Sequence, residues 1–248
     1  MMTKQRSRAF NAVLEHHRCW VSSDGACFDL VRSAGLTPAI AYTIAQDYGV
    51  ARNIGKRERV AALADDISSV TDGSWNVSLA DREAICRNIG TSHQENGSSR
   101  HLPISGVTKL MWFLRPDGWT MYDSFARKGL VGASKGAHDF YKKLGECGFV
   151  ECAAAITQKC RALGLPLFGE RIIDKFLMLR GMDNAAYDWT AVLTKSHFTL
   201  MPSERQEQLE ALGGFVEGMN LEERFPAPVA RARRPKNQSA TITSGTSA

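Results

Sequence analysis

Lys109 has the surroundings of a reactive lysine. Trp112 and Phe113 follow it by three and four residues and share its face of a predicted helix, so its amino group has apolar neighbours. Ser105 is a suitable N-cap for this helix, which places the lysine about one turn inside it, where a cation opposes the helix dipole. Both effects lower the pKa of the amino group, and such a lysine can form a Schiff base. The alternative is a surface lysine whose stem covers apolar residues while its ammonium group stays in water.

Asp123 follows after an extended aromatic stretch and precedes the next predicted helix. Aspartate is a favoured N-cap residue, and capping alone explains its position. An N-cap aspartate can also face a cavity, where the helix start keeps it ionised. It would then stabilise a developing cation or accept a proton from a nearby amine. The structural and the chemical roles are compatible.

Helical periodicity runs through nearly the whole sequence and predicts an all-α protein. Helices are expected over residues 10–17, 38–48, 56–70, 78–90, 106–114, 135–145, 150–163, 171–180 and 204–216, and another begins after Asp123. The polar run TSHQENGSSR, residues 91–100, predicts a surface loop. A turn at residues 116–118 separates the helix of Lys109 from the stretch that leads to Asp123. No repeat and no alternating strand pattern is present.

The composition divides the chain into a globular body and a basic tail. With 248 residues, 44% hydrophobic and 23% charged, the chain is long enough for a core. Residues 1–224 are expected to form the helical domain, and residues 225–248 a disordered tail rich in proline, arginine and serine. Of the net charge of +5, four charges belong to this tail, which leaves the body at +1. A strongly basic body of the histone type is therefore excluded, whereas a local basic face is not.

Several classes of protein are disfavoured by the sequence. No apolar run approaches the roughly 18 residues that span a bilayer, and no apolar stretch follows the N-terminal cations as in a signal peptide. The six cysteines contain no C-x-x-C pair, and none of the six histidines has the ligand spacing of a zinc site. We therefore expect a cytoplasmic, monomeric protein with reduced thiols, no membrane segment, no metal and no cofactor.

Residues 102–124 combine a Leu-Pro pair, the run GVTK that ends at Lys109, an apolar helix and the run YDS around Asp123. This order resembles the core of the helix-hairpin-helix DNA glycosylase superfamily, and within it the bacterial proteins described as having an 8-oxoguanine DNA glycosylase fold. In that family a hairpin of the form L-P-G-V-G-x-K ends in the catalytic lysine, and an aspartate at the start of the next helix completes the site. The run RIIDKFL, residues 171–177, looks like the closing helix of the bacterial group. The sequence keeps one glycine where family hairpins usually carry two, its lysine-to-aspartate spacing is shorter, and the iron–sulfur loop of some relatives is absent.

The resemblance implies a helix-hairpin-helix glycosylase-like helical domain, either as one body or as two lobes with a cleft between them. It implies DNA as the partner and Lys109 and Asp123 as the catalytic residues of a DNA glycosylase, with or without lyase activity. One alternative is a non-catalytic DNA-binding or sensing protein of the same fold, for example in phage defence. Another is a purely structural helical protein in which the two residues are a surface charge and a helix cap.

Further residues of the same segment are candidates for contacts with nucleic acid. Backbone N–H groups at a helix start bind phosphate, which selects Ser105, Gly106 and Thr108. Arg115, Arg127 and Lys128 are the candidate cations, and Trp112, Trp119 and Tyr122 are the aromatic residues that would stack on an extruded base. The alternatives are a solvated charged face and aromatic core residues.

Overall fold

The computed structural model describes residues 6–55, 57–96 and 102–228. No strand occurs in these ranges, so the all-α prediction is confirmed. None of the described helices has the length and apolar character needed to cross a membrane. The elements are α1 (Arg8–Cys19), the π-helical turn η1 (Trp20–Asp24), α2 (Gly25–Ala34), α3 (Pro38–Asp47), α4 (Ala51–Ile54), α5 (Arg57–Ser68), α6 (Asp72–Trp75), α7 (Leu79–Glu95), α8 (Ile104–Leu114), α9 (Ser124–Leu130), α10 (Ala137–Glu146), α11 (Phe149–Ala162), α12 (Gly169–Gly181), α13 (Asn184–Thr199), α14 (Ser203–Gly218) and α15 (Leu221–Arg224).

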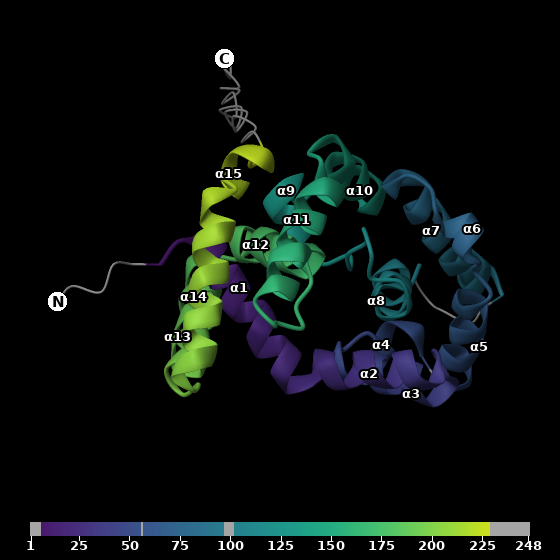
Figure 1. Cartoon of the computed structure of the whole chain (residues 1–248). Helices are drawn as coiled ribbons and strands as arrows, with labels where there is room; N and C mark the ends of the chain where they lie inside the picture. The colour runs from purple at the N-terminus through teal and green to yellow at the C-terminus, as the bar shows by residue number, and fades with distance from the viewer. Residues whose placement is uncertain (1–5, 56, 97–101, 229–248) are drawn as a thin grey trace, which may run out of the picture.

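Two helices are the centres of two groups (Figure 1). α8 packs against α2, α3, α5 and α7, whereas α12 packs against α1, α9 and α11. In Figure 1, α2, α3 and α4 lie below and to the right of α12, α5 to α7 lie to its right beyond α8, and α13 and α14 lie on the opposite side of the molecule. Residues 115–123 lead from α8 to α9 and so connect the two groups. We call them the α8 group and the α12 group.

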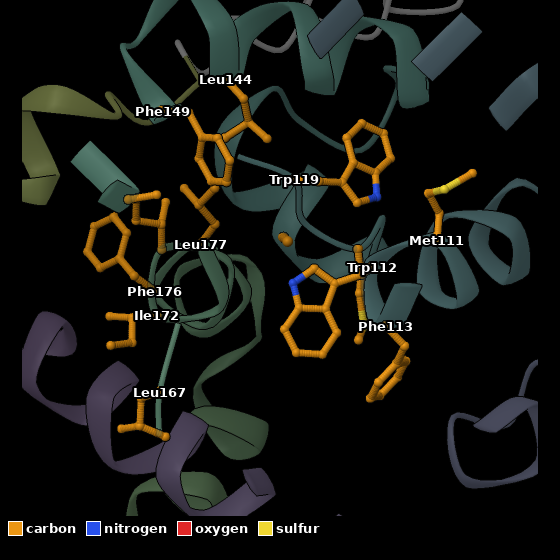
Figure 2. Packing of buried hydrophobic residues seen from close by; sticks show 14 of the residues in the cluster. Met111, Trp112, Phe113, Trp119, Leu144, Phe149, Leu167, Ile172, Phe176 and Leu177 are labelled. Atoms are coloured by element: carbon orange, nitrogen blue, oxygen red, sulfur yellow. The ribbon is translucent and has the colours of Figure 1, made fainter. Parts of the chain in front are cut away.

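Aromatic and aliphatic side chains from both groups share the core (Figure 2). Trp112 and Phe113 of α8, Trp119 of the connecting segment, Phe149 of α11 and Phe176 of α12 are all fully or almost fully buried. A large aromatic side chain contributes roughly 150–250 Å² of buried area, so these rings supply much of the hydrophobic stabilisation. The apolar residues that precede and follow Lys109 in the sequence therefore belong to the hydrophobic core.

The loop predicted at residues 91–100 begins five residues later than expected, because α7 continues to Glu95. Two tertiary contacts hold the C-terminal end of α7. Gly90 packs against Leu102, whose Cδ1 would lie 3.1 Å from a Cβ at this position. His93 Nε2 lies 2.7 Å from Asp66 Oδ2 on α5. Residues 97–101, which belong to the predicted loop and hairpin, lie outside the described residues.

Helix α13 was not predicted, because its polarity pattern is inverted. Thr190 and Thr194 are buried on the face that packs on the body, whereas Trp189 is 64% exposed and Val192 is also exposed. A helix normally shows its core-facing side as an apolar stripe, and here that stripe contains threonines. The threonine hydroxyls bond backbone carbonyls of their own helix, at Ala186 and Ala191, which removes the cost of burying them.

The helical body extends beyond the predicted boundary at residue 224. Phe225, assigned from the sequence to the tail, is 0% exposed, and its carbonyl oxygen accepts a hydrogen bond from Arg180 Nη1. Pro228 lies beside Gly132. Residues 225–228 therefore belong to the body, and the remainder of the predicted tail, residues 229–248, lies outside the described residues.

Glycines set the distance between α12 and its neighbours. A Cβ at Gly129 of α9 would overlap the carbonyl oxygen of Leu177, and one at Gly181 would overlap the carbonyl oxygen of Phe125. On the other side of α12, a Cβ at Gly169 would overlap the carbonyl oxygen of Ala153 on α11. The backbones are in direct contact at these three positions, so only glycine fits.

We predict that Gly129→Ala lowers the free energy of unfolding by about 2–3 kcal/mol, because the new methyl group forces α9 away from α12. Gly145→Ala in α10 is the matched control, since nothing lies within 4 Å of a Cβ there. Replacing an unhindered helical glycine by alanine stabilises by about 0.5–1 kcal/mol. Urea denaturation of both variants measures the difference. Equal stabilities would contradict a close contact between α9 and α12.

Candidate functional site

A cavity of about 470 Å³ lies where the α8 group, the connecting segment and α12 meet. This volume is within the range of small-ligand sites, roughly 300–1,000 Å³. Ser105 and Lys109 line it from α8, and Asp123 lines it from the start of α9. The two residues predicted to be catalytic therefore face one cavity. The other lining residues are Tyr48, Val50, Met121, Tyr122, Ser124, Arg171, Asp174, Lys175 and Met178.

Lys109 is buried in this wall, with 7% of its surface exposed. Its Nζ donates hydrogen bonds to Ser105 Oγ at 2.6 Å and to the carbonyl oxygen of Tyr122 at 3.0 Å. Ser105 is not the predicted N-cap, because α8 already begins at Ile104 after Pro103. Its hydroxyl instead joins Lys109 to the connecting segment, since it also donates to the carbonyl oxygen of Tyr122 at 3.2 Å.

Burial lowers the pKa of Lys109 from 10.5 to about 8, because the ammonium form loses its hydration. The negative charge of Asp123 and then that of Asp174 oppose this shift, and the cations Arg171 and Lys175 reinforce it. At a pKa of 8, about one amino group in ten is neutral at pH 7, against about one in several thousand for an ordinary lysine. The sequence predicts the direction of the shift, and its main cause is burial rather than the helix dipole.

Asp123 is the N-cap of α9, as the sequence predicts. Its Oδ1 accepts hydrogen bonds from the backbone N–H groups of Phe125 at 2.8 Å and Ala126 at 3.2 Å. Its carboxylate also lines the cavity and acts on the charge of Lys109. Capping and a place in the site therefore coexist in one side chain.

Helix α12 adds buried charges to the wall of the cavity. Arg171 Nη1 donates to Asp174 Oδ2, and Arg171 Nη2 lies 3.7 Å from Asp24 Oδ2. Lys175 Nζ lies 3.9 Å from Glu15 Oε1 of α1. Each cation of α12 thus has a carboxylate near it, as buried charges require.

Sequence analysis identifies residues 171–177 as a helix similar to one in the resembled family, but it does not predict Arg171, Asp174 and Lys175 as site residues. Their spacing could have indicated it, because residues 171, 174 and 175 follow the i, i+3, i+4 pattern that places charges on one face of an otherwise apolar helix. The structure also buries His16 and His17 of α1, and His16 Nε2 accepts a hydrogen bond from the backbone N–H of Phe168 at 3.2 Å.

The structure places the three predicted phosphate-contact residues of this helix start, Ser105, Gly106 and Thr108, in different surroundings. Gly106 packs on Ile54, whose Cδ1 would be 2.8 Å from a Cβ. Thr108 is fully buried, and its hydroxyl accepts from the backbone N–H of Tyr122 at 3.1 Å. Of the three residues, Ser105 alone lines the cavity. The glycine serves close helix packing, and the threonine holds the connecting segment.

The three predicted cations differ in their surroundings. Arg115 is bound to Asp72 and donates to the carbonyl oxygen of Val70 at 2.6 Å, so its charge is engaged within the protein. Arg127 is half-buried, with Nη1 3.4 Å from Tyr122 Oη. Lys128 is exposed on α9.

Two of the three predicted stacking residues are core residues. Trp112 and Trp119 are both fully buried. Trp119 stacks on Tyr141 with a centroid distance of 4.2 Å, and its indole N–H donates to the carbonyl oxygen of Thr108. The alternative weighed from the sequence, aromatic core residues, is therefore the correct one for these two. Tyr122 is half-buried and lines the cavity.

A second cavity, of about 650 Å³, lies between α1 and α13. Arg6, Asp188 and Lys195 contribute its charges, and Leu14 and Phe198 contribute apolar surface. We assign the site to the smaller cavity, because a buried amine and two carboxylates meet there. Within the described ranges, no cluster of three or more His, Cys, Asp or Glu residues is placed to hold a metal.

No protein-family model, no curated protein and no solved structure matches this chain. The function must therefore be argued from the site itself.

Proposed function

We propose that the protein is a DNA glycosylase, with or without lyase activity, in which Lys109 is the nucleophile and Asp123 stabilises the reacting sugar. The observation that carries this proposal is the shared cavity. A buried lysine with a pKa of about 8 and a helix-capping aspartate line the same space. A lysine with a lowered pKa is the group that amine-based covalent catalysis needs. The resemblance of residues 102–124 to the glycosylase core supports the same assignment.

The proposed reaction begins with the neutral amine of Lys109. Its nitrogen bonds to C1′ of the sugar while the bond from C1′ to the base breaks, and the base leaves with the bonding electron pair and takes up a proton. The carboxylate of Asp123 stabilises the positive charge that develops on the sugar. Opening of the sugar ring, with transfer of a proton to its oxygen, gives the Schiff base. Elimination of the 3′ phosphate from this intermediate would then break the strand.

The size and lining of the cavity suit an extruded nucleotide. Enzymes that act on a base in duplex DNA take it out of the stack and into a pocket. Tyr122 is the aromatic side chain of the connecting segment that lines the cavity, and a base can stack on such a ring. Lys128 on the exposed side of α9 and the four cations among residues 231–236 would contact phosphates.

A non-catalytic DNA-binding or sensing protein is the second candidate. One observation favours it: the amino group of Lys109 already donates to Ser105 Oγ and to the carbonyl oxygen of Tyr122. A lysine held by two acceptors can be a structural tie between α8 and the connecting segment. Covalent trapping separates the two candidates, because a structural lysine forms no adduct with DNA.

We predict that the protein forms a covalent adduct with DNA containing an abasic site in the presence of borohydride, and that Lys109→Gln abolishes it. DNA affinity should change by less than about threefold, because one cation of several is lost. Lys142→Gln is the matched control, since it removes an exposed cation of α10 that does not line the cavity and should keep the adduct. An unchanged adduct in Lys109→Gln would contradict the proposal. Base release from a panel of damaged DNAs is measured in parallel, because a glycosylase without lyase activity escapes trapping.

Asp123→Asn should lower the rate of base release by about a hundredfold, as expected for loss of a charged catalytic group. It should change the free energy of unfolding by less than about 0.5 kcal/mol, because asparagine caps a helix about as well as aspartate. Asp183→Asn is the matched control: Asp183 caps α13 through a 2.9 Å bond from the backbone N–H of Ala186, and it does not line the cavity. Normal base release by Asp123→Asn would show that Asp123 is only a cap.

Removal of residues 229–248 should weaken non-specific DNA binding and make it less sensitive to salt. The removed segment carries four cations and no acid. Each phosphate contact that is lost lowers the slope of log affinity against log salt by about 0.9. Titrations at several salt concentrations measure this slope, and an unchanged slope would show that the tail does not contact DNA. The cut is placed after residue 228 because Phe225 belongs to the core.

A further inference from the structure

The carboxyl group of Asp174 is the one acidic group of the cavity wall that neither Lys109 chemistry nor helix capping explains. Its residue is 1% exposed and lines the cavity together with Lys109 and Asp123. Oδ2 accepts a hydrogen bond from Arg171, whereas Oδ1 is buried and has no hydrogen-bond partner within the described residues. A buried carboxylate oxygen without a partner is costly, so its place in the wall of the cavity that Lys109 also lines calls for an explanation.

The carboxylate of Asp123 is already engaged as a helix cap, whereas Asp174 keeps one buried oxygen without a partner among the described residues. Oδ1 of Asp123 accepts two backbone N–H groups of α9, and these bonds are strongest when the carboxylate is ionised. Asp174 has the opposite environment. Burial raises its pKa from 3.8 to about 6, against the opposing effect of Arg171. A group that titrates between pH 5 and 8 is a better proton acceptor at neutral pH.

We propose that Asp174 is the proton acceptor that converts the ammonium group of Lys109 into the attacking amine, and that it returns this proton to the departing base. The inference rests on the proposed glycosylase function. One proton passes from Lys109 to the carboxylate of Asp174 through a water molecule in the cavity that both side chains line. As the nitrogen bonds to C1′ and the bond to the base breaks, the carboxylic acid of Asp174 gives its proton to the leaving base and becomes a carboxylate again. Of the two protons left on the nitrogen, one goes to the sugar ring oxygen when the ring opens, and the Schiff base keeps the other.

The charges around Asp174 come from three elements. Arg171 and Lys175 lie on α12 itself, Lys109 faces it from α8, and Asp123 faces it from the start of α9. Behind Arg171 lie Asp24 and the hydroxyl of Tyr48, which are joined by a 2.7 Å hydrogen bond. On α1, His16 and Cys19 lie close enough to Arg171 and Lys175 to interact with their charges. Against the opposing effect of burial, neighbouring acidic groups raise the pKa of Arg171 and that of Lys175, so both stay charged at neutral pH. Lys109 and Asp174 are the cavity-wall groups whose pKa values are shifted toward neutrality.

The sign of the pH dependence separates proton transfer from a purely electrostatic effect. The negative charge of Asp174 raises the pKa of Lys109. If Asp174 acted only through this charge, Asp174→Asn would leave more neutral amine at low pH and would react faster there. If Asp174 accepts the proton, the same variant reacts more slowly below the pKa of Lys109, because the transfer partner is gone.

The test measures the rate of adduct formation between the protein and a DNA duplex with a single abasic site, trapped by cyanoborohydride between pH 5.5 and 9. This substrate has no base to expel, so it isolates activation of the amine. The wild-type rate should change by less than about threefold from pH 6.5 to 8 and fall below pH 6. For Asp174→Asn we expect at least a tenfold loss at pH 6.5 and a rate within about threefold of wild type at pH 9, where Lys109 is already neutral.

Asp24→Asn is the matched control. It removes the other carboxylate near Arg171 and does not line the cavity, so it should keep the wild-type profile. A faster reaction of Asp174→Asn at pH 6.5, or a profile equal to that of wild type, overturns the inference and leaves the glycosylase proposal intact. The wild-type protein alone can also overturn the inference. If its rate falls tenfold per pH unit from pH 8 downward, the reaction follows only the titration of Lys109, and no side chain accepts its proton. A wild type that forms no adduct at any pH overturns the proposed chemistry of Lys109 itself.

Discussion

The direct backbone contact of α12 with α9 and α11 is the constraint on which the rest of the structure depends. Because Gly129, Gly169 and Gly181 have no side chain, α12 is fixed between its neighbours at a distance that admits almost no adjustment. Nearly every residue of α12 is buried as a result. A helix enclosed on all sides must carry both the apolar surface of the core and the polar wall of the cavity, and α12 does so on different faces.

Enclosure also decides how the charges of α12 are arranged. A buried ion pair seldom stabilises a protein more than apolar residues of the same volume, since both charges lose their hydration. Yet Arg171, Asp174 and Lys175 occupy adjoining positions of a helix that otherwise supplies isoleucine, phenylalanine and leucine to the core. Stability alone does not account for them. Their common feature is that all three border the cavity beside Lys109, which is the arrangement expected when charge serves chemistry rather than folding.

The sequence predicts the parts of this molecule that depend on local interactions. The all-α class follows from periodicity, and Asp123 is recognisable as an N-cap from its neighbours alone. From the sequence alone Trp119 is either a base-stacking candidate or a core residue, because burial is not a local property; in the structure it packs on Tyr141 from a distant helix. Asp174 was missed for the same reason. The spacing of residues 171, 174 and 175 shows that they share one helix face, but it does not show which helices cover that face or that it borders a cavity.

The two halves of the site are held in place by different forces. The connecting segment is tied to α8 by short polar bonds: Thr108 Oγ receives the backbone N–H of Tyr122, and Ser105 and Lys109 both donate to its carbonyl oxygen. Asp123 directly follows Tyr122 and caps α9, whose backbone is in direct contact with α12 at Gly129 and Gly181. The two carboxylates, Asp123 and Asp174, are therefore fixed relative to each other by the packing of α9 on α12. Lys109 belongs to α8, and its position relative to both carboxylates depends on the hydrogen bonds that tie Tyr122 to α8. Weakening these bonds would move the amine away from both carboxylates at once, so the polar ties of Tyr122 are what keeps the proposed site assembled.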